Sequence, residues 1–326
     1  MNSFGRNFRI TIFGSSHGPY TGILMDGIPP GIALDSNDFC HDISRRSSGR
    51  TGSTLRRESD IPEIISGTYN GRTSGTPLVI LFKNGDTKSE DYGKIASHPR
   101  PSHADLTAHI KYGGYNDPRG GGQFSGRMTL PLVAAGVVAK KILKGVSFDT
   151  ILTEVGGESD PNKWEHLLSD AKDSGDSLGG IVKVTVSGVH VGYGDPFFDS
   201  LESSIGHLVF SIPGIKGVEF GSGFGAARSC GKDNNDIILD SSGRTASNND
   251  GGVNGGISNG NPLIISAAFK PAPSIAAAQD TYSFKAGKRI PLEIGGRHDA
   301  CIALRGAVAV EAAVAIVLAE MKLRRS

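Results

Sequence analysis

Residues 119–127, RGGGQFSGR, followed by residues 128–141, MTLPLVAAGVVAKK, constrain the fold of this chain more than any other stretch. The three consecutive glycines lack a Cβ and can adopt positive φ, so their backbone can approach a flat or anionic ligand closely. The flanking arginines suit phosphate or carboxylate, and the N-terminus of an apolar helix expected over residues 128–145 adds partial positive charge. The pattern predicts an anion-binding loop at the start of a buried helix; the alternative is a tight turn without a ligand.

The composition excludes several classes of protein. The chain has 326 residues, 37% of them hydrophobic, and a formal net charge of +1, which gives no global field to recruit nucleic acid. No apolar run reaches the roughly 18 residues that a membrane span needs, and the N-terminus shows no signal-peptide core. Three cysteines without CxxC spacing fit a reduced chain and argue against disulfides or zinc. We therefore expect a cytoplasmic protein with no metal, nucleic-acid or membrane partner.

Periodicity predicts a mixed fold. Helices are expected at 36–46, 128–145, 161–173, 200–211 and 306–321, and strands at 8–13, 22–27, 64–69, 77–82, 181–190 and 263–271. Strict βαβ alternation is absent, which favours an α+β sandwich over a doubly wound sheet. Residues 229–261, rich in Gly, Asn, Asp and Ser, are typical of a linker.

Histidines mark two candidate sites. His17 follows a strand between Gly14 and Gly18, where it can serve as a general acid or base; a surface histidine in a turn is the alternative. Residues 98–103, HPRPSH, place two histidines on a proline-stiffened segment. A metal site there lacks further ligands at supporting spacing, so we expect none.

Arginines gather in two other segments. Residues 45–57 hold five of them among Ser, Thr and Gly, and a small, multiply anionic ligand explains them better than a nucleic-acid patch or a solvated face. Residues 295–299, GGRHD, join a guanidinium, an imidazole and an acid in a glycine-led turn. That turn is either functional or a structural ion-pair network.

Several of these segments are also short motifs that occur in a fixed order. They are residues 14–18 (GSSHG), 26–31 (DGIPPG), 103–105 (HAD), 111–113 (KYG), 119–122 (RGGG), 255–260 (GGISNG) and 296–299 (GRHD). From about residue 4 to residue 323, in this order, the chain resembles the chorismate synthase family.

The resemblance implies both a fold and a reaction. The fold is one domain, residues 1–326, a β-α-β sandwich in which antiparallel sheets enclose helices, assembled as a homotetramer. The reaction is the 1,4-anti elimination of phosphate from 5-enolpyruvylshikimate 3-phosphate to give chorismate, the last step of the shikimate pathway and part of aromatic amino-acid biosynthesis. It requires reduced FMN without net redox change. No Rossmann glycine motif stands in a strand–turn–helix context, so NADPH would act only indirectly, through an external flavin reductase.

The resemblance also implies roles for single residues. His17 would protonate the departing phosphate, His103 the reduced flavin near N1, and Asp299 would assist proton removal through flavin N5. Contacts to the substrate phosphate or carboxylates, or to an NADP phosphate, are implied for Ser16, Arg46, Arg50 and Arg127. Flavin contacts are implied for Gln123, Phe124, Ser125, Pro213, Gly214, Gly255, Lys270, Pro271, Ala272, Pro273, Ser274 and Arg297, the last of which would also neutralise substrate.

The chain departs from the family at a few positions. After the glycines the family usually has Arg-Ser-Ser-Ala-Arg-Glu-Thr, where residues 123–129 read QFSGRMT. An arginine is thus replaced by Gln123, and Phe124 is added beside the expected cofactor. Ser102 stands where the family usually has glycine. The alternative to an active enzyme is therefore a flavin-binding homologue of the same fold with impaired or lost turnover.

Overall fold

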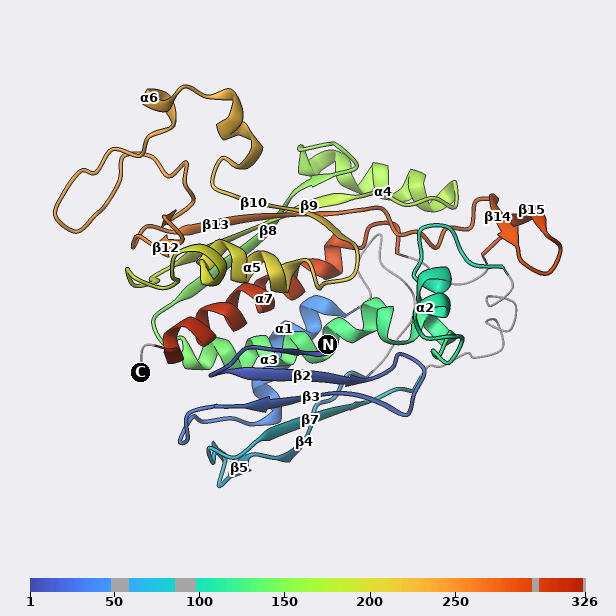
Figure 1. Cartoon of the computed structure of the whole chain (residues 1–326), viewed down its shortest axis with the longest axis horizontal. Coiled ribbons are helices and arrows are strands. Elements are labelled where there is room, and N and C mark those ends of the chain that lie inside the picture. The colour runs from blue at the N-terminus through green and yellow to red at the C-terminus, as the bar shows by residue number, and fades with distance from the viewer. Residues whose placement is uncertain (48–58, 86–97, 295–298, 325–326) are drawn as a thin grey trace.

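Two antiparallel sheets enclose a layer of helices in the computed structural model (Figure 1). The structure describes residues 1–47, 59–85, 98–294 and 299–324. The predictions for Arg50 and Arg297 lie outside these ranges. The layered arrangement confirms the expected α+β sandwich.

The first sheet has the strand order β1-β2-β3-β7-β4. Its members are β1 (Ser3–Phe4), β2 (Arg9–Gly14), β3 (Tyr20–Asp26), β7 (Leu78–Lys83) and β4 (Glu63–Ser66). Ile23 pairs with Ile12 on one side and Ile80 on the other, so these three residues form an apolar row across the sheet. The strand expected over 64–69 is broken at Gly67, where φ is +90° and a Cβ would lie 2.4 Å from the Cα of Leu78. The chain continues there as the small pair β5 (Thr68–Tyr69) and β6 (Arg72–Thr73).

The second sheet has the order β10-β13-β9-β8. Its strands are β10 (Ile215–Phe220), β13 (Leu263–Phe269), β9 (Gly180–Ser187) and β8 (Ser147–Val155). Alternate residues of β9 and β13 are buried, with Val184 opposite Ile265, so one face of this sheet covers the helices. Helix α4 (Trp164–Asp173), entered through η5 (Pro161–Lys163), lies on the other side of this sheet (Figure 1).

The helical layer consists of η1 (Ser36–Phe39), α1 (Cys40–Arg46), α3 (Thr129–Ile142), α5 (Leu201–Val209) and α7 (Ala303–Arg324). Helices α3 and α7 are apolar on nearly every side, as expected for helices enclosed by other elements. They approach each other so closely that a Cβ on Gly136 would lie 2.4 Å from that of Ala312. One continuous apolar core joins both sheets to these helices.

A charged cluster crosses this layer. Glu311 of α7 is 2% exposed and accepts hydrogen bonds from Arg45 of α1 and Lys140 of α3. Lys140 also contacts Asp42 at 2.6 Å. Burial alone would raise the pKa of Glu311, but the bonds from Arg45 and Lys140 lower it to about 2. The cluster therefore fastens three helices by ionised groups.

The remaining elements lie at the periphery. They are α2 (Asp105–Lys111), η3 (Arg119–Phe124), η4 (Gly126–Met128), η6 (Phe197–Asp199), η7 (Gly223–Arg228), α6 (Gly231–Asn234), and the pairs β11 (Val253–Asn254) with β12 (Ile257–Ser258) and β14 (Gln279–Ser283) with β15 (Lys288–Leu292). Within the described ranges no helix combines the length and apolarity of a membrane span.

The segment that reads as a linker is folded into an arm at one end of the molecule (Figure 1). The carboxylate of Asp236 accepts hydrogen bonds from the backbone N–H groups of Asn249 and Asp250 and from the hydroxyl of Ser247. Its polar residues therefore serve local hydrogen bonds, which composition alone does not reveal.

Candidate active site

A cavity of about 1180 Å³ is lined by residues from α1, α2, β10, β13, β15 and the start of α7. It collects most of the predicted site residues, although they are widely separated in sequence. Those that line it are Arg46, His103, Gln123, Phe124, Ser125, Arg127, Pro213, Gly214, Lys270, Ala272, Pro273, Ser274 and Asp299. Among the described residues that were predicted, four do not line it: Ser16, His17, Gly255 and Pro271. Gly255 belongs to the β11–β12 turn, at the end of the molecule away from α2 (Figure 1).

The glycine triplet forms one wall of the cavity. Gly120, Gly121 and Gly122 have φ values of 57°, 79° and 53°, as their sequence predicts. The chain then passes through η4 into α3, so the cavity wall includes the start of this helix. Arg119 does not line the cavity; it ion-pairs with Asp117 at 2.9 Å, and its side chain is about half exposed. Only the second flanking cation, Arg127, therefore faces the cavity.

His17 lies behind this wall. A Cβ on Gly120 would lie 2.0 Å from Cε1 and Nδ1 of the His17 ring, so only glycine fits there. The Ser16 hydroxyl donates to the carbonyl of Gly120 at 3.0 Å and lies 3.2 Å from His17 Nδ1. With the Ser16 N–H bound to the Gly122 carbonyl at 3.2 Å, the loop after β2 is docked onto the glycine loop. His17 is 9% exposed, in contrast to the exposed histidine that the sequence suggested.

His103 is held by a salt-bridged turn. Two nitrogens of the Arg100 guanidinium donate to the two oxygens of Asp105, each at 2.8 Å. Burial opposes ionisation of Asp105, but the bonds from Arg100 keep its pKa below the usual value. The His103 ring faces the cavity with Nε2 2.7 Å from the hydroxyl of Ser274. No group of three His, Cys, Asp or Glu converges in the part of the chain that the structure describes.

The segment 270–274 is held by hydrogen bonds at Lys270 and at Ala272. Lys270 donates from Nζ to the carbonyl of Ser102 at 2.8 Å, and the Ser177 hydroxyl donates to the carbonyl of Ala272 at 2.7 Å. Burial, with a smaller effect from Lys216, lowers the pKa of Lys270. Ser102 has a φ of +57°, which explains why glycine suits this position in the family.

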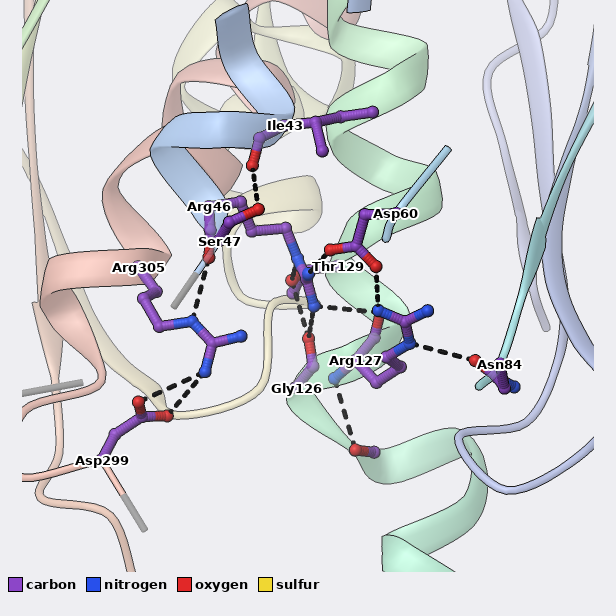
Figure 2. Close-up of polar contacts among 11 residues, drawn as sticks. Ile43, Arg46, Ser47, Asp60, Asn84, Gly126, Arg127, Thr129, Asp299 and Arg305 are labelled. Carbon is purple, nitrogen blue, oxygen red and sulfur yellow. Dashed lines mark hydrogen bonds and ion pairs between the residues drawn. The ribbon is translucent and has the colours of Figure 1, made fainter. Parts of the chain in front are cut away.

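A buried ion cluster stands beside the helix start (Figure 2). Asp60, 5% exposed, accepts from Arg46 at 3.3 Å and, through its other oxygen, from Arg127. Arg46 is further bound to the hydroxyl of Thr129 and to the carbonyl of Gly126. Burial, then the like charge of a nearby arginine, lowers the pKa of Arg46 to about 9. The Arg46 guanidinium is thus hydrogen-bonded to protein groups, and its contribution to the site is its positive charge.

Arg305 links this cluster to Asp299. Its Nε donates to the Arg46 carbonyl at 2.9 Å, and its Nη1 lies 3.1 and 3.2 Å from the two Asp299 oxygens (Figure 2). All three residues line the cavity. Arg305 therefore holds the Asp299 carboxylate in one orientation, next to the Arg46–Asp60–Arg127 cluster.

Gln123 and Phe124, the two residues after the glycine triplet that differ from the usual family sequence, have different surroundings. Asn2 donates to the amide oxygen of Gln123 at 3.3 Å, at a point where a smaller cavity of about 210 Å³ adjoins the first. Phe124 is half exposed, and its ring centroid lies 6.5 Å from that of Tyr112. The phenylalanine thus adds an aromatic surface to the cavity wall.

Sequence reasoning missed three residues of this network, Asp60, Asn84 and Arg305. Asp60 directly precedes Ile61-Pro62, and Asn84 follows a predicted strand, so both stand at element ends where functional side chains commonly lie. Arg305 falls just before the residue at which the last helix was expected to begin. These positions at the ends of expected elements are the only features of the sequence that could have pointed to the three residues.

Fold and site together define the class of protein. A cavity that joins a buried arginine cluster to a histidine and an oriented carboxylate is typical of an enzyme that acts on an anionic small molecule. The chain belongs to the chorismate synthase family: the model described as "Chorismate synthase" matches residues 8–323. Members of this family are lyases of aromatic amino-acid biosynthesis, which confirms the reaction class expected from the motifs.

Individual relatives agree with this assignment. A chorismate synthase of Chitinophaga pinensis is 53% identical, covering 99% of this chain and 97% of that protein. One from Dehalococcoides mccartyi is 42% identical, covering 99% of this chain and 97% of its own length. A crystal structure of chorismate synthase superposes with a TM-score of 0.76 at 26% identity, covering 99% of this chain and 93% of that one.

Proposed function

We propose that this chain converts 5-enolpyruvylshikimate 3-phosphate to chorismate and phosphate by 1,4-anti elimination, with reduced FMN bound beside the substrate. One observation carries the proposal: the Arg46–Asp60–Arg127 cluster forms a wall of the same cavity that holds His103 and Asp299. Fixed cations stabilise the negative charge that develops on a departing phosphate.

The substrate carries a phosphate and carboxylates, and the cavity offers matching charge. Arg127 and Lys270 lie in its wall, and Arg46 adds a buried positive charge next to Arg127. Because Arg46 and Arg127 are buried, their charges act more strongly than they would at an exposed surface. The Arg127 side is therefore the proposed phosphate end of the site.

Proton transfer is assigned to three groups. His17 is the proposed acid for the departing phosphate; its ring does not line the cavity but packs against Gly120 in the cavity wall, so it would act at the edge of this loop. Asp299, oriented by Arg305, would be the base that accepts the proton lost from the substrate ring. His103, whose ring contacts Ser274, would hold a proton beside reduced FMN. Each such general acid or base contributes about 10²–10⁴-fold to the rate.

The cavity also fits a flat cofactor. Its volume of about 1180 Å³ exceeds that of most single-ligand sites, which are about 300–1,000 Å³. The backbone of the glycine triplet, the Phe124 ring and the segments 213–214 and 270–274 would hold reduced FMN. When bound, reduced FMN lends an electron transiently and returns it, so the reaction has no net redox change. An external flavin reductase, using NADPH, would supply the reduced form.

We also propose a homotetramer of single-domain subunits in the cytoplasm. The arm around α6 exposes Phe224, Ile237, Ile238 and Leu239, each more than half exposed. Apolar groups gathered on one extended arm favour contact with another subunit. Sedimentation analysis checks this: a tetramer is expected, and a monomer at micromolar concentration would contradict it.

The activity itself is tested under anaerobic conditions. Purified protein, chemically reduced FMN and the enolpyruvyl substrate should give chorismate and phosphate, and His17→Ala and His103→Ala should each lower kcat by about tenfold or more. Tight FMN binding without phosphate release would instead identify a flavin-binding homologue without turnover. Oxidation of NADPH by the protein with FMN alone would contradict the need for an external reductase.

A further inference from the structure

The side chain of Asn84 joins two parts of the site that no sequence motif connects. Its Oδ1 accepts a hydrogen bond from Arg127 Nε at 3.0 Å (Figure 2). Its Nδ2 donates to the carbonyls of Ser15 at 3.0 Å and Gly18 at 2.7 Å. These two carbonyls flank the Ser16-His17 pair.

The sheet explains why Asn84 lies there. Strand β7 ends at Lys83, which pairs with Tyr20 at the start of β3, so the next residue of β7 lies beside the loop that precedes β3. The backbone N–H of Asn84 donates to the Pro19 carbonyl at 3.1 Å and continues the ladder by one bond. Its side chain therefore projects from a rigid strand end into the space between the loop and α3.

The chemistry of the side chain matters as much as its place. A primary amide offers an acceptor and two donor hydrogens on one short, planar group. Here the acceptor serves a cation and both donors serve backbone carbonyls, so the three bonds use both ends of the amide. Aspartate would lack the donors, and leucine, similar in size, would lack both functions.

The two parts that Asn84 joins also have contacts of their own. The Arg127 guanidinium is bound by Asp60. The loop that carries His17 is bound to the glycine triplet through Ser16. Asn84 bonds directly to both, and so fixes the loop and the guanidinium relative to each other.

We propose that Asn84 is a positioning residue for phosphate departure, fixing the loop of His17 relative to the Arg127 guanidinium. The proposal rests on the functions proposed above for His17 and Arg127. A leaving phosphate must meet the cation and the acid at the same moment, so their relative placement decides the rate. Misplacement of a catalytic group by about 1 Å can lower a rate by about 100-fold.

The test is a double-mutant cycle. Asn84→Leu should lower kcat by about tenfold or more in the otherwise unchanged protein, but by less than about twofold in a His17→Ala background, because groups that act as a unit are non-additive. Asn84→Gln, which keeps the amide on a longer arm, should restore part of the loss. Asn37→Leu is the matched control, since Asn37 is exposed in η1 and its change should leave kcat unaltered.

A second readout does not depend on turnover. Calorimetric titration with inorganic phosphate should show weaker binding to Asn84→Leu, by about threefold or more, because the Arg127 guanidinium loses the hydrogen bond that orients its Nε. Circular dichroism establishes the folded fraction, and Asn84→Gln supplies the comparison if the leucine variant folds poorly.

Two outcomes overturn the proposal while leaving the enzyme's function intact. One is an equal loss of kcat from Asn84→Leu with and without His17. The other is unchanged kcat and phosphate affinity in a folded Asn84→Leu protein. If the unaltered protein forms no chorismate, the proposed function fails instead, and the phosphate titration still reports on the contact with Arg127.

Discussion

Replacing Gly120 with alanine should remove activity while leaving the fold in place. The new Cβ would lie 2.0 Å from two atoms of the His17 ring and 2.8 Å from the Ser16 hydroxyl. Carbon atoms in contact normally stay about 3.5–4.0 Å apart, so the ring must move by roughly 1.5 Å. The displaced group is the proposed acid for phosphate departure.

The size of the effect follows from two separate terms. An alanine at a φ of +57° destabilises the fold by about 1–2 kcal/mol, which a protein of this size can tolerate. Displacement of the general acid should lower kcat by about tenfold or more, as expected for His17→Ala. Because the protein stays folded, this fall in kcat would report the misplaced acid and not unfolding.

Gly126→Ala in the same loop is the matched control. A Cβ there meets nothing within 4 Å, and alanine is the usual residue of the family at this position. We expect its stability to change by no more than about 0.5 kcal/mol and its kcat to stay within about twofold of the original.

The assay measures chorismate formation by folded protein, with anaerobic, chemically reduced FMN. Gly120→Ala should add little to the loss already caused by His17→Ala, since both act on the same group. A folded Gly120→Ala protein with unaltered kcat would refute the reasoning. Equal damage from Gly126→Ala would refute it as well.

Three further changes test the charges and the backbone. The pKa of Glu311 is about 2 in the folded protein against 4.5 in the unfolded chain, so its ionisation adds roughly 3 kcal/mol to the free energy of unfolding above pH 4.5. This contribution is lost as the pH falls toward 2. Denaturant unfolding should therefore show that Glu311→Gln is less stable than the original protein at pH 7 and that the difference is smaller at pH 3. Asp60→Asn should destabilise by about 3–5 kcal/mol, since two buried arginines lose their carboxylate, and added phosphate should raise its melting temperature more than that of the original protein. Ser102→Gly should gain about 0.5–1 kcal/mol by relieving a φ of +57°; a loss of stability in chemical unfolding would contradict this.

Apolar sequence was sufficient to predict the central elements and insufficient at the edges of the fold. The segments that form α3 and α7 were recognised as continuous apolar runs, because these helices are buried on nearly every side. Strand β8 was missed because it is a sheet edge in which only Val155 is buried, so its sequence lacks a clear apolar alternation; its pairing with β9 is set by the tertiary fold. Helix α2 has too few turns to show a period.

The site was predictable where one segment carries its own chemistry. The glycine triplet implies positive φ and close approach; all three residues have positive φ, and Gly120 and Gly122 lie in close contact with neighbouring groups. The sequence analysis expected Arg119 to face the ligand, but Arg119 forms an ion pair with Asp117, two residues before it. Asp60 and Arg305 escaped notice because their importance lies in contacts with residues distant along the chain.

The central claim is that this cavity eliminates phosphate with reduced FMN as a cofactor that is not consumed. The most direct measurement follows chorismate, inorganic phosphate and the flavin spectrum together in one anaerobic reaction. We predict equimolar chorismate and phosphate over many turnovers, with the flavin still reduced at the end. Absence of both products, or one flavin oxidised for each phosphate released, would contradict the account.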